Sequence, residues 1–133
     1  MKRNERGFTL IELVTVIAIL GVLAAMTVPK FFALQVKATI ETENQIIGTI
    51  RAGLETYAAN QIVQGGNKVY PVHNTTGTLL ADILNPIPAG WDFAGGLAEG
   101  TITHTRSDSD VTYTYTRPSD ASYTIGTRLA TAN

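Results

Sequence analysis

The stretch that decides the fold is ERGFTLIELVTVIAILGVLAAMTVPKFF, residues 5–32. From Phe8 to Val28 it is apolar, with one ionisable exception, Glu12. At about 1.5 Å rise per residue, a helix over residues 8–28 spans roughly 30 Å, the thickness of a bilayer's hydrocarbon core. A carboxylate in an inserted helix costs several kcal/mol unless it is paired or protonated. The sequence therefore predicts a membrane-spanning helix whose Glu12 needs a partner.

The residues before this helix predict its orientation. The leader MKRNERG carries Lys2, Arg3 and Arg6 against Glu5. Positive residues favour the cytoplasmic side, so the N-terminus stays in the cytoplasm and the C-terminal bulk is exported.

Three interpretations of the apolar segment compete. An ordinary secretory signal peptide has a shorter apolar region of about 7–15 residues, and Ala24 is only a tolerable cleavage site. A plain membrane anchor leaves Glu12 unexplained. In the third interpretation, which we favour, Glu12 is functional and awaits a partner charge in another copy of the chain.

The run RGFTLIELVTVIAILGVLAAMTVPKFF closely resembles the class III signal and N-terminal helix of type IV pilins and type II secretion pseudopilins. The basic leader, Gly7, the run Phe-Thr-Leu-Ile-Glu-Leu and Pro29 carry this resemblance, which covers residues 6–32. It implies cleavage after Gly7 and N-methylation of Phe8 by a prepilin peptidase/methyltransferase. It also implies that Glu12 of an incoming subunit meets the Phe8 amine of its neighbour, a pairing that fixes register.

The same resemblance implies a location, partners and a function. The subunit is stored in the bacterial inner membrane as a single-pass protein. An inner-membrane assembly platform then joins copies of it into a helical extracytoplasmic filament at the cell surface. The expected function is therefore a structural subunit of a type IV pilus-like filament, not an enzyme. One alternative is a pseudopilin of a type II secretion system, and a second is a membrane-anchored extracytoplasmic binding module that does not polymerise.

Two features depart from the family pattern. The chain has no cysteine, so it lacks the disulfide that closes the C-terminal loop of many pilins. Major pseudopilins lack that disulfide too, but their Asp-Pro-Trp-Gly loop is not found in NPIPAGWDFAGG, residues 85–96. We therefore lean only slightly towards a pilus subunit.

The membrane segment continues into an amphipathic helix. Pro29 in a helix interior costs about 3 kcal/mol, yet apolar residues recur afterwards at spacings of three, four or seven. These residues are Ile40, Ile47, Ile50, Leu54, Tyr57 and Ala58, with polar positions at Lys37, Glu41, Glu43, Gln45, Arg51 and Glu55. We expect one helix from about residue 8 to 62, kinked near Pro29. The resemblance implies that the stretch between Gly21 and Pro29 melts when subunits pack.

The residues after the helix predict a small head. QGGNK at residues 64–68 predicts a break after the helix, and residues 69–72 predict a short extended piece. Residues 78–84 predict one or two helical turns capped by Thr78. Residues 85–96 predict a loop that places Trp91 and Phe93 in the core. From Thr101 the sequence alternates in TITHTR, VTYTYTR and SYTIGTR, separated by the turn sequences SDSD and RPSD. This pattern predicts a three-stranded antiparallel meander. Its inward face holds Ile102, Val111, Tyr113, Tyr115, Tyr123 and Ile125, and its outward face Thr112, Thr114 and Thr116.

The predicted fold class is therefore α+β, with a long N-terminal helix, kinked near Pro29, packed on a small antiparallel sheet of about three to four strands. The chain divides into a cleaved leader (1–7), a transmembrane and filament-core half of the helix (8–28), an amphipathic half (29–62) and a globular head (63–133).

No catalytic site is predicted. The chain's two histidines, His73 and His104, have no carboxylate at triad or metal-ligand spacing. The net charge of -1 gives no basic footprint for nucleic acid. Asp108 and Asp110 are weak candidates for a calcium site, but no recognisable order of six or more oxygen ligands surrounds them. A solvated turn is the favoured interpretation, so we expect no cofactor.

Overall fold

The computed structural model describes residues 7–72 and 78–132. The leader residues 1–6 and His73 lie outside the described residues. The chain divides into two compact units, residues 1–45 and 46–133, each described by itself.

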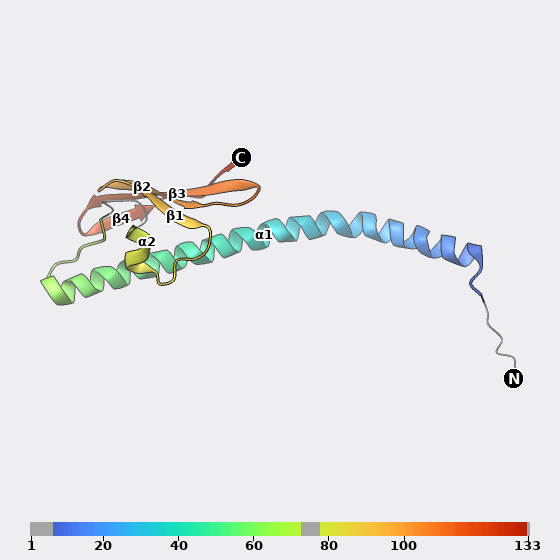
Figure 1. Ribbon diagram of the computed structural model, residues 1–133, viewed down its shortest axis with the longest axis horizontal. Coiled ribbons are helices and arrows are strands. Elements are labelled where there is room, and N and C mark those ends of the chain that lie inside the picture. The colour runs from blue at the N-terminus through green and yellow to red at the C-terminus, as the bar shows by residue number, and fades with distance from the viewer. Residues whose placement is uncertain (1–6, 73–77, 133) are drawn as a thin grey trace, which may run out of the picture. The chain divides into compact units, whose positions relative to one another are not determined.

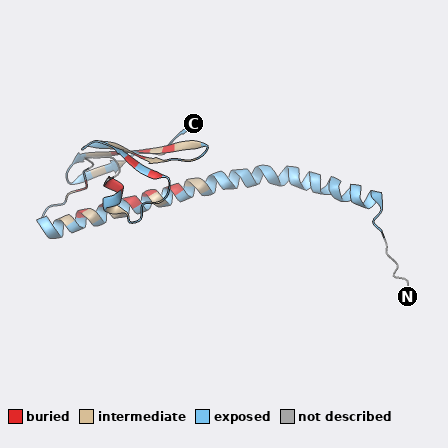
Figure 2. Ribbon diagram, in the orientation of Figure 1, coloured by how far each residue is buried: buried red, intermediate tan, exposed pale blue. Residues whose placement is uncertain are grey.

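The first unit is helical. The helix α1 (Leu10–Gly65) begins here and continues into the second unit. It stays α-helical through Gly21 and Pro29, so the helix is not interrupted where the sequence predicted weak stability. From residue 7 to 38 every described residue is exposed, and Figure 2 shows this part of α1 in the colour of exposed residues.

The end of α1 is set by two glycines. Gly66 has a φ of 76°, the left-handed conformation that glycine adopts without a steric penalty directly after a helix. Its N–H donates to the carbonyl of Ile62 at 2.9 Å. The predicted break at residues 64–68 is therefore confirmed, and α1 ends three residues beyond the expected boundary.

The second unit places a five-stranded antiparallel sheet and a short helix against the end of α1 (Figure 1). The short helix is α2 (Thr78–Ile83). The strands are β1 (Trp91–Gly95), β2 (Glu99–His104), β3 (Ser109–Ser119), β4 (Ser122–Ile125) and β5 (Leu129–Ala132). The order is β1-β2-β3-β4, and β5 pairs with the other end of β3. The predicted α+β class and the meander, which is β2-β3-β4, are confirmed.

The head departs from the sequence prediction in three places. Residues 91–95 form strand β1 and not a loop, because Trp91 and Phe93 pair across from His104 and Ile102. Residues 117–119 of RPSD belong to β3, and the turn is at residues 120–121. Pro118 is accommodated there because the β3–β4 register shifts between Thr116 and Ser119. The short strand β5 was not predicted. Residues 69–72, expected as a short extended piece, belong to no helix or strand.

The core lies between one face of the sheet and one stripe of α1. Ile50, Leu54, Phe93, Ile102 and Val111 are completely buried. The predicted inward residues Tyr113 and Tyr115 are buried, whereas Tyr123 and Ile125 are partly buried against the same cluster. Trp91 and Phe93 belong to the core as expected.

One prediction about α1 is wrong. Glu43 was expected at a solvated polar position, but it is 1% exposed. It lies four residues before Ile47, and four residues on a helix return to the same face. The buried stripe of α1 therefore includes a carboxylate, at a position that the spacing of three and four residues from Ile40 and Ile47 places on the stripe.

Candidate functional site

The start of α1 is built around Thr9 and Glu12. The backbone N–H and the hydroxyl of Thr9 each donate a hydrogen bond of 2.8 Å to Oε2 of Glu12. In return, the backbone N–H of Glu12 donates to the Thr9 hydroxyl at 3.3 Å. This reciprocal pattern is a capping box, in which the first residue before a helix and its third residue satisfy each other's free donors.

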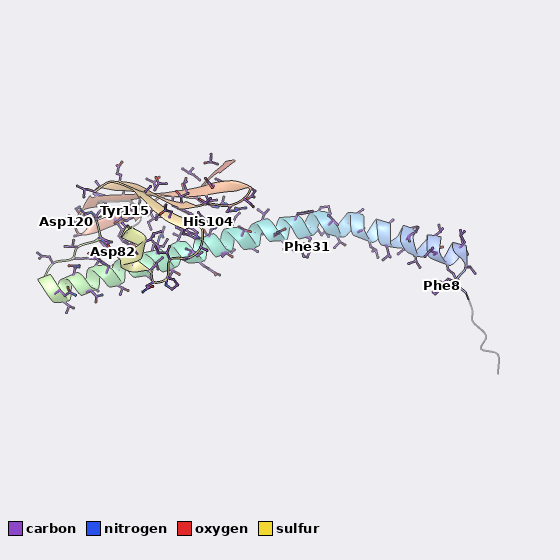
Figure 3. All side chains as sticks on the ribbon, in the orientation of Figure 1. Phe8, Phe31, Asp82, His104, Tyr115 and Asp120 are labelled. Atoms are coloured by element: carbon purple, nitrogen blue, oxygen red, sulfur yellow. The ribbon has the colours of Figure 1, made fainter. Side chains whose placement is uncertain are left out.

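The capping box begins at Thr9, one residue after Phe8, which is the first residue beyond the predicted cleavage point. Phe8 is 87% exposed, and a Cβ added at Gly7 would meet nothing within 4 Å. Gly7, Phe8 and the Glu12 carboxylate thus gather at the first turn of α1, and Figure 3 labels Phe8 at this end of the helix. Proteolysis after Gly7 would create an α-amino group close to a carboxylate that Thr9 already orients.

Sequence reasoning missed the role of Thr9. The signal was present, because Thr-Leu-Ile-Glu at residues 9–12 matches the capping-box pattern of Thr followed three residues later by Glu. Because the flanking residues are apolar, Glu12 was interpreted only as a charge within a membrane segment and not as part of a helix cap.

The apolar surface in the first half of α1 is exposed among the described residues. The described part of the chain contains one helix that is long and apolar enough to cross a membrane, and none of its most apolar window is buried. Its large apolar side chains from Phe8 to Val36 are between 45% and 87% exposed. Thr15 and Thr27 donate their hydroxyls to the carbonyls of Ile11 and Leu23, at 2.7 and 2.8 Å. These two hydroxyls are therefore satisfied within the helix, as a low-dielectric surrounding requires.

Gly21 lies in this helix with open space where a side chain would be. Pro29 also lies inside α1. The predicted kinking or melting at these two positions stays a prediction.

A polar cluster ties the segment after α1 back to the helix. The hydroxyl of Tyr70 donates to Oε1 of Glu55 at 2.7 Å, and Nζ of Lys68 lies 3.3 Å from Oε2 of Glu55. Lys68 also lies over the Tyr70 ring, 4.9 Å from its centroid. The hydrogen bond from Tyr70, assisted by the charge of Lys68, lowers the pKa of the Glu55 carboxyl. The cluster holds the segment after α1 against the helix, and Glu55 and Tyr70 line a cavity of the head.

The remaining predicted site residues lie apart from α1's first turn. Asp108 pairs with Arg106 at 2.8 Å, while Oδ1 of Asp110 is buried without a hydrogen-bond partner among the described residues. Within residues 7–72 and 78–132, no three His, Asp or Glu side chains cluster as metal ligands would. His104 stacks on Trp91, with ring centroids 4.7 Å apart and planes 6° from parallel. The geometry therefore gives His104 a packing contact, and Asp108 and Asp110 have no third carboxylate or imidazole near them among the described residues.

Comparison with known proteins shows what the N-terminal segment is similar to. Residues 2–28 match the model of the prokaryotic N-terminal methylation motif. The chain is 34% identical over 100 residues to the type II secretion system core protein G of Pseudomonas aeruginosa, covering 72% of this chain and 65% of that protein. It is 38% identical over 56 residues to the type IV major fimbrial protein FimA of Dichelobacter nodosus, covering 42% and 36%.

A further relative is the type IV major pilin protein PilA of Myxococcus xanthus, 54% identical over 35 residues, which are 26% of this chain and 16% of that protein. The chain thus spans less than two thirds of the length of each of these relatives. No solved structure matches the chain significantly.

Proposed function

We propose that this chain, which carries the prokaryotic N-terminal methylation motif and is homologous to type IV fimbrial proteins and to type II secretion core protein G, is a structural subunit of a type IV pilus-like filament. The subunit is stored in the inner membrane with its N-terminus in the cytoplasm. It then polymerises through α1 into an extracytoplasmic filament at the cell surface.

The observation that carries this proposal is the uncovered apolar surface of α1. Over residues 8–36 the helix exposes apolar side chains, and none of the residues that the structure describes buries them. Soluble monomers rarely expose apolar patches larger than a few hundred Å². Lipid supplies the cover before assembly, and the helices of other copies supply it in the filament. One helix surface thus serves both as an anchor and as a polymer core.

Glu12 explains how a subunit leaves the lipid for the filament. In the single chain, Thr9 satisfies Oε2 of Glu12 with two hydrogen bonds, which lowers the cost of holding the carboxylate near a membrane. A full opposite charge is a stronger partner than two neutral donors. The Phe8 amine created by cleavage after Gly7 is that charge. Pairing Glu12 with the Phe8 amine of a neighbour favours docking and fixes the axial step between copies.

The processing that this scheme requires follows from the same motif. A prepilin peptidase/methyltransferase removes residues 1–7 and methylates Phe8, and an inner-membrane platform adds the processed subunit to the growing fibre. The exposed position of Gly7 and Phe8 at the start of the helix supports access by such an enzyme. The proposed role is structural and requires no catalytic site in this chain.

A second candidate is a pseudopilin of a type II secretion system. The specific observation in its favour is the higher identity over a long match, 34% over 100 residues to core protein G of Pseudomonas aeruginosa against 25% over 111 residues to the fimbrial protein EcpC of Eikenella corrodens. The similarity to core protein G therefore extends into the head.

The test is intact and N-terminal mass spectrometry on two fractions, sheared surface material and washed membranes. A methylated chain beginning at Phe8 in the sheared fraction supports a surface pilus subunit. The same species confined to membranes favours the pseudopilin. A chain that begins at Met1, or after Ala24, contradicts both and leaves an anchored binding module or a secreted protein.

A further inference from the structure

The head contains a cavity of about 510 Å³ between the second half of α1 and the edge strand β4. Its walls are Arg51 and Glu55 from α1, Tyr70, and residues 121–125. All of these residues belong to the second compact unit. We call this cavity the Arg51 groove.

The charges in the Arg51 groove do not cancel. Glu55 is already engaged by the hydroxyl of Tyr70 and by the ammonium of Lys68. Arg51 is exposed, and its guanidinium has no hydrogen bond or ion pair with the described residues. Tyr123 lines the same cavity as Arg51, and burial is the main cause that raises the pKa of its hydroxyl. The groove therefore presents a free cation next to a hydroxyl, a combination that binds a carboxylate.

The opposite flank of α1 carries the short helix α2. A Cβ added at Gly53 would come within 2.9 Å of the carbonyl oxygen of Ile83, so the end of α2 lies directly against Gly53. Two residues along a helix turn by about 200° at 3.6 residues per turn. Arg51 and Gly53 therefore point to opposite flanks of α1 at nearly the same height.

The α2 flank offers the charge that the groove lacks. Asp82, labelled on α2 in Figure 3, is exposed. Its carboxylate has no hydrogen bond or ion pair with the described residues. Ile87, shortly after α2, leaves 37% of its surface exposed and adds an apolar contact. The two flanks of one head are thus complementary in charge, a free carboxylate on one side and a free guanidinium in a groove on the other.

We infer that the Asp82 flank of one copy docks into the Arg51 groove of a second copy of this chain. The inference rests on the proposed function, because copies whose α1 helices run parallel present opposite flanks to one another. The two patches are different surfaces of the same molecule, so the contact is heterologous and leaves a free groove and a free flank after each addition. Such contacts generate open filaments when the rotation does not close a ring.

The contact fixes how the heads of neighbouring copies are aligned along the filament. Charge pairs at the edge of an interface steer encounter and fix orientation more than they add affinity. Exposed pairs are also screened when ions are abundant, with a Debye length of about 3 Å at 1 M salt. The Asp82–Arg51 contact is therefore expected to weaken in high salt, while the apolar packing of α1 does not.

The decisive experiment uses site-specific cross-linking in assembled filaments of the full chain. Native cysteines are absent, so Arg51→Cys and Asp82→Cys are the only thiols introduced. A short bismaleimide is used, because an Arg–Asp pair holds its Cα atoms farther apart than the 4.4–6.8 Å or so that a disulfide spans. The double variant is expected to give a ladder of multimers. A mixture of the two single variants is expected to give dimers only.

In the control, the second cysteine is introduced at Glu99 and not at Asp82. Glu99 is an exposed carboxylate at the start of β2. The pair Arg51→Cys and Glu99→Cys is expected to give no ladder. Filaments that form normally but give no Arg51–Asp82 ladder, or an equal ladder with Glu99, overturn the inference and leave the filament function intact. Failure of the wild-type chain to form filaments is a separate result, which contradicts the proposed function itself.

Charge reversal supplies a second variant set. Arg51→Glu or Asp82→Lys alone is expected to lower the yield of sheared filaments, and the two together are expected to restore it. A double variant that stays as poor as the single variants contradicts the contact. Washed membranes must hold equal amounts of processed subunit in each case, which separates assembly from folding.

Discussion

The carboxylate of Glu12 accepts the backbone N–H and the hydroxyl of Thr9, both at 2.8 Å, through one and the same oxygen. The residue that assembly would use as a charge is therefore also the third residue of a capping box. The two roles differ in what they require. Capping needs an acceptor, which glutamine also supplies, whereas pairing with the Phe8 amine needs a negative charge. This difference makes the roles separable by mutation.

Glu12→Gln is expected to leave the helix start intact and to block filament assembly. The amide oxygen replaces the carboxylate as the acceptor from Thr9, but the charge for the neighbour's amine is lost. Glu12→Ala should lose assembly and in addition about 1 kcal/mol of helix stability. The measurement is the amount of sheared filament, with the processed chain in membranes counted by mass spectrometry. Thr9→Ser, which keeps the hydroxyl, is the matched control.

Normal filament yield from Glu12→Gln would contradict the docking role of the charge. In that case the capping box alone would account for the glutamate.

Gly7→Val is expected to block removal of the leader. The position has open space around it, since a Cβ there meets nothing within 4 Å. A fold defect is therefore not expected, and the effect isolates recognition by the peptidase. Gly21→Ala, also in open space, is the control and should be processed normally. N-terminal sequencing of the membrane fraction decides, and a Gly7→Val chain that begins at Phe8 would refute the cleavage assignment.

Gly100→Ala is expected to destabilise the head. A Cβ at Gly100 would collide with the ring of Phe93, which is completely buried and cannot move without repacking. Overpacking of this kind costs about 1–3 kcal/mol. Gly96→Ala, in the adjoining turn, meets only the Glu99 carbonyl at 3.9 Å and should change stability little. Denaturant unfolding of the full chain in detergent measures both, and equal stability of the two variants would show that the Phe93 contact is not restrictive.

The head is expected to lose stability at alkaline pH. Burial raises the pKa of Tyr115 to about 12, so the folded state favours the protonated phenol. Its contribution is fully present below the ordinary tyrosine pKa of about 10 and is lost as pH rises from there through about 12. Each pH unit in this window costs up to about 1.4 kcal/mol for one such group.

Tyr115→Phe removes the ionisable group and should flatten the alkaline limb of the stability curve. Thr114→Ser, on the other face of the same strand, is the control. The measurement is denaturant unfolding of the full chain between pH 9 and 12, with phenolate absorbance recorded in parallel. An unchanged alkaline limb in Tyr115→Phe would assign the effect to other groups.

Most of the fold followed from local pattern. The apolar run and the later spacing of Ile47, Ile50 and Leu54 predicted the helix and its buried stripe, because a helix returns to the same face every three to four residues. The alternation around Tyr113 and Tyr115 predicted β3 by the same logic with a period of two. What escaped prediction was long-range. Glycines at the ends of residues 91–95 favour a turn, and the segment is a strand because it pairs with β2.

The candidate site divides in the same way. Gly7, Phe8, Thr9 and Glu12 are neighbours in the chain, so their geometry at the helix start is a local matter and the residue pattern carries it. The groove of Arg51 is not local. It depends on which elements fold back over α1, and no periodicity in the helix indicates them.

The sequence by itself determined that this chain has a helix that must be covered by lipid or by other helices, because transfer of so much apolar surface into water is unfavourable. It also determined the charge at the start of that helix and the α+β class of the head. Only the tertiary structure decided that Arg51 and α2 lie on opposite flanks of α1, since this depends on the packing of Ile83 directly against Gly53. It also decided which charges are neutralised within the head, because Lys68 and Tyr70 meet Glu55 only when the segment after α1 folds back.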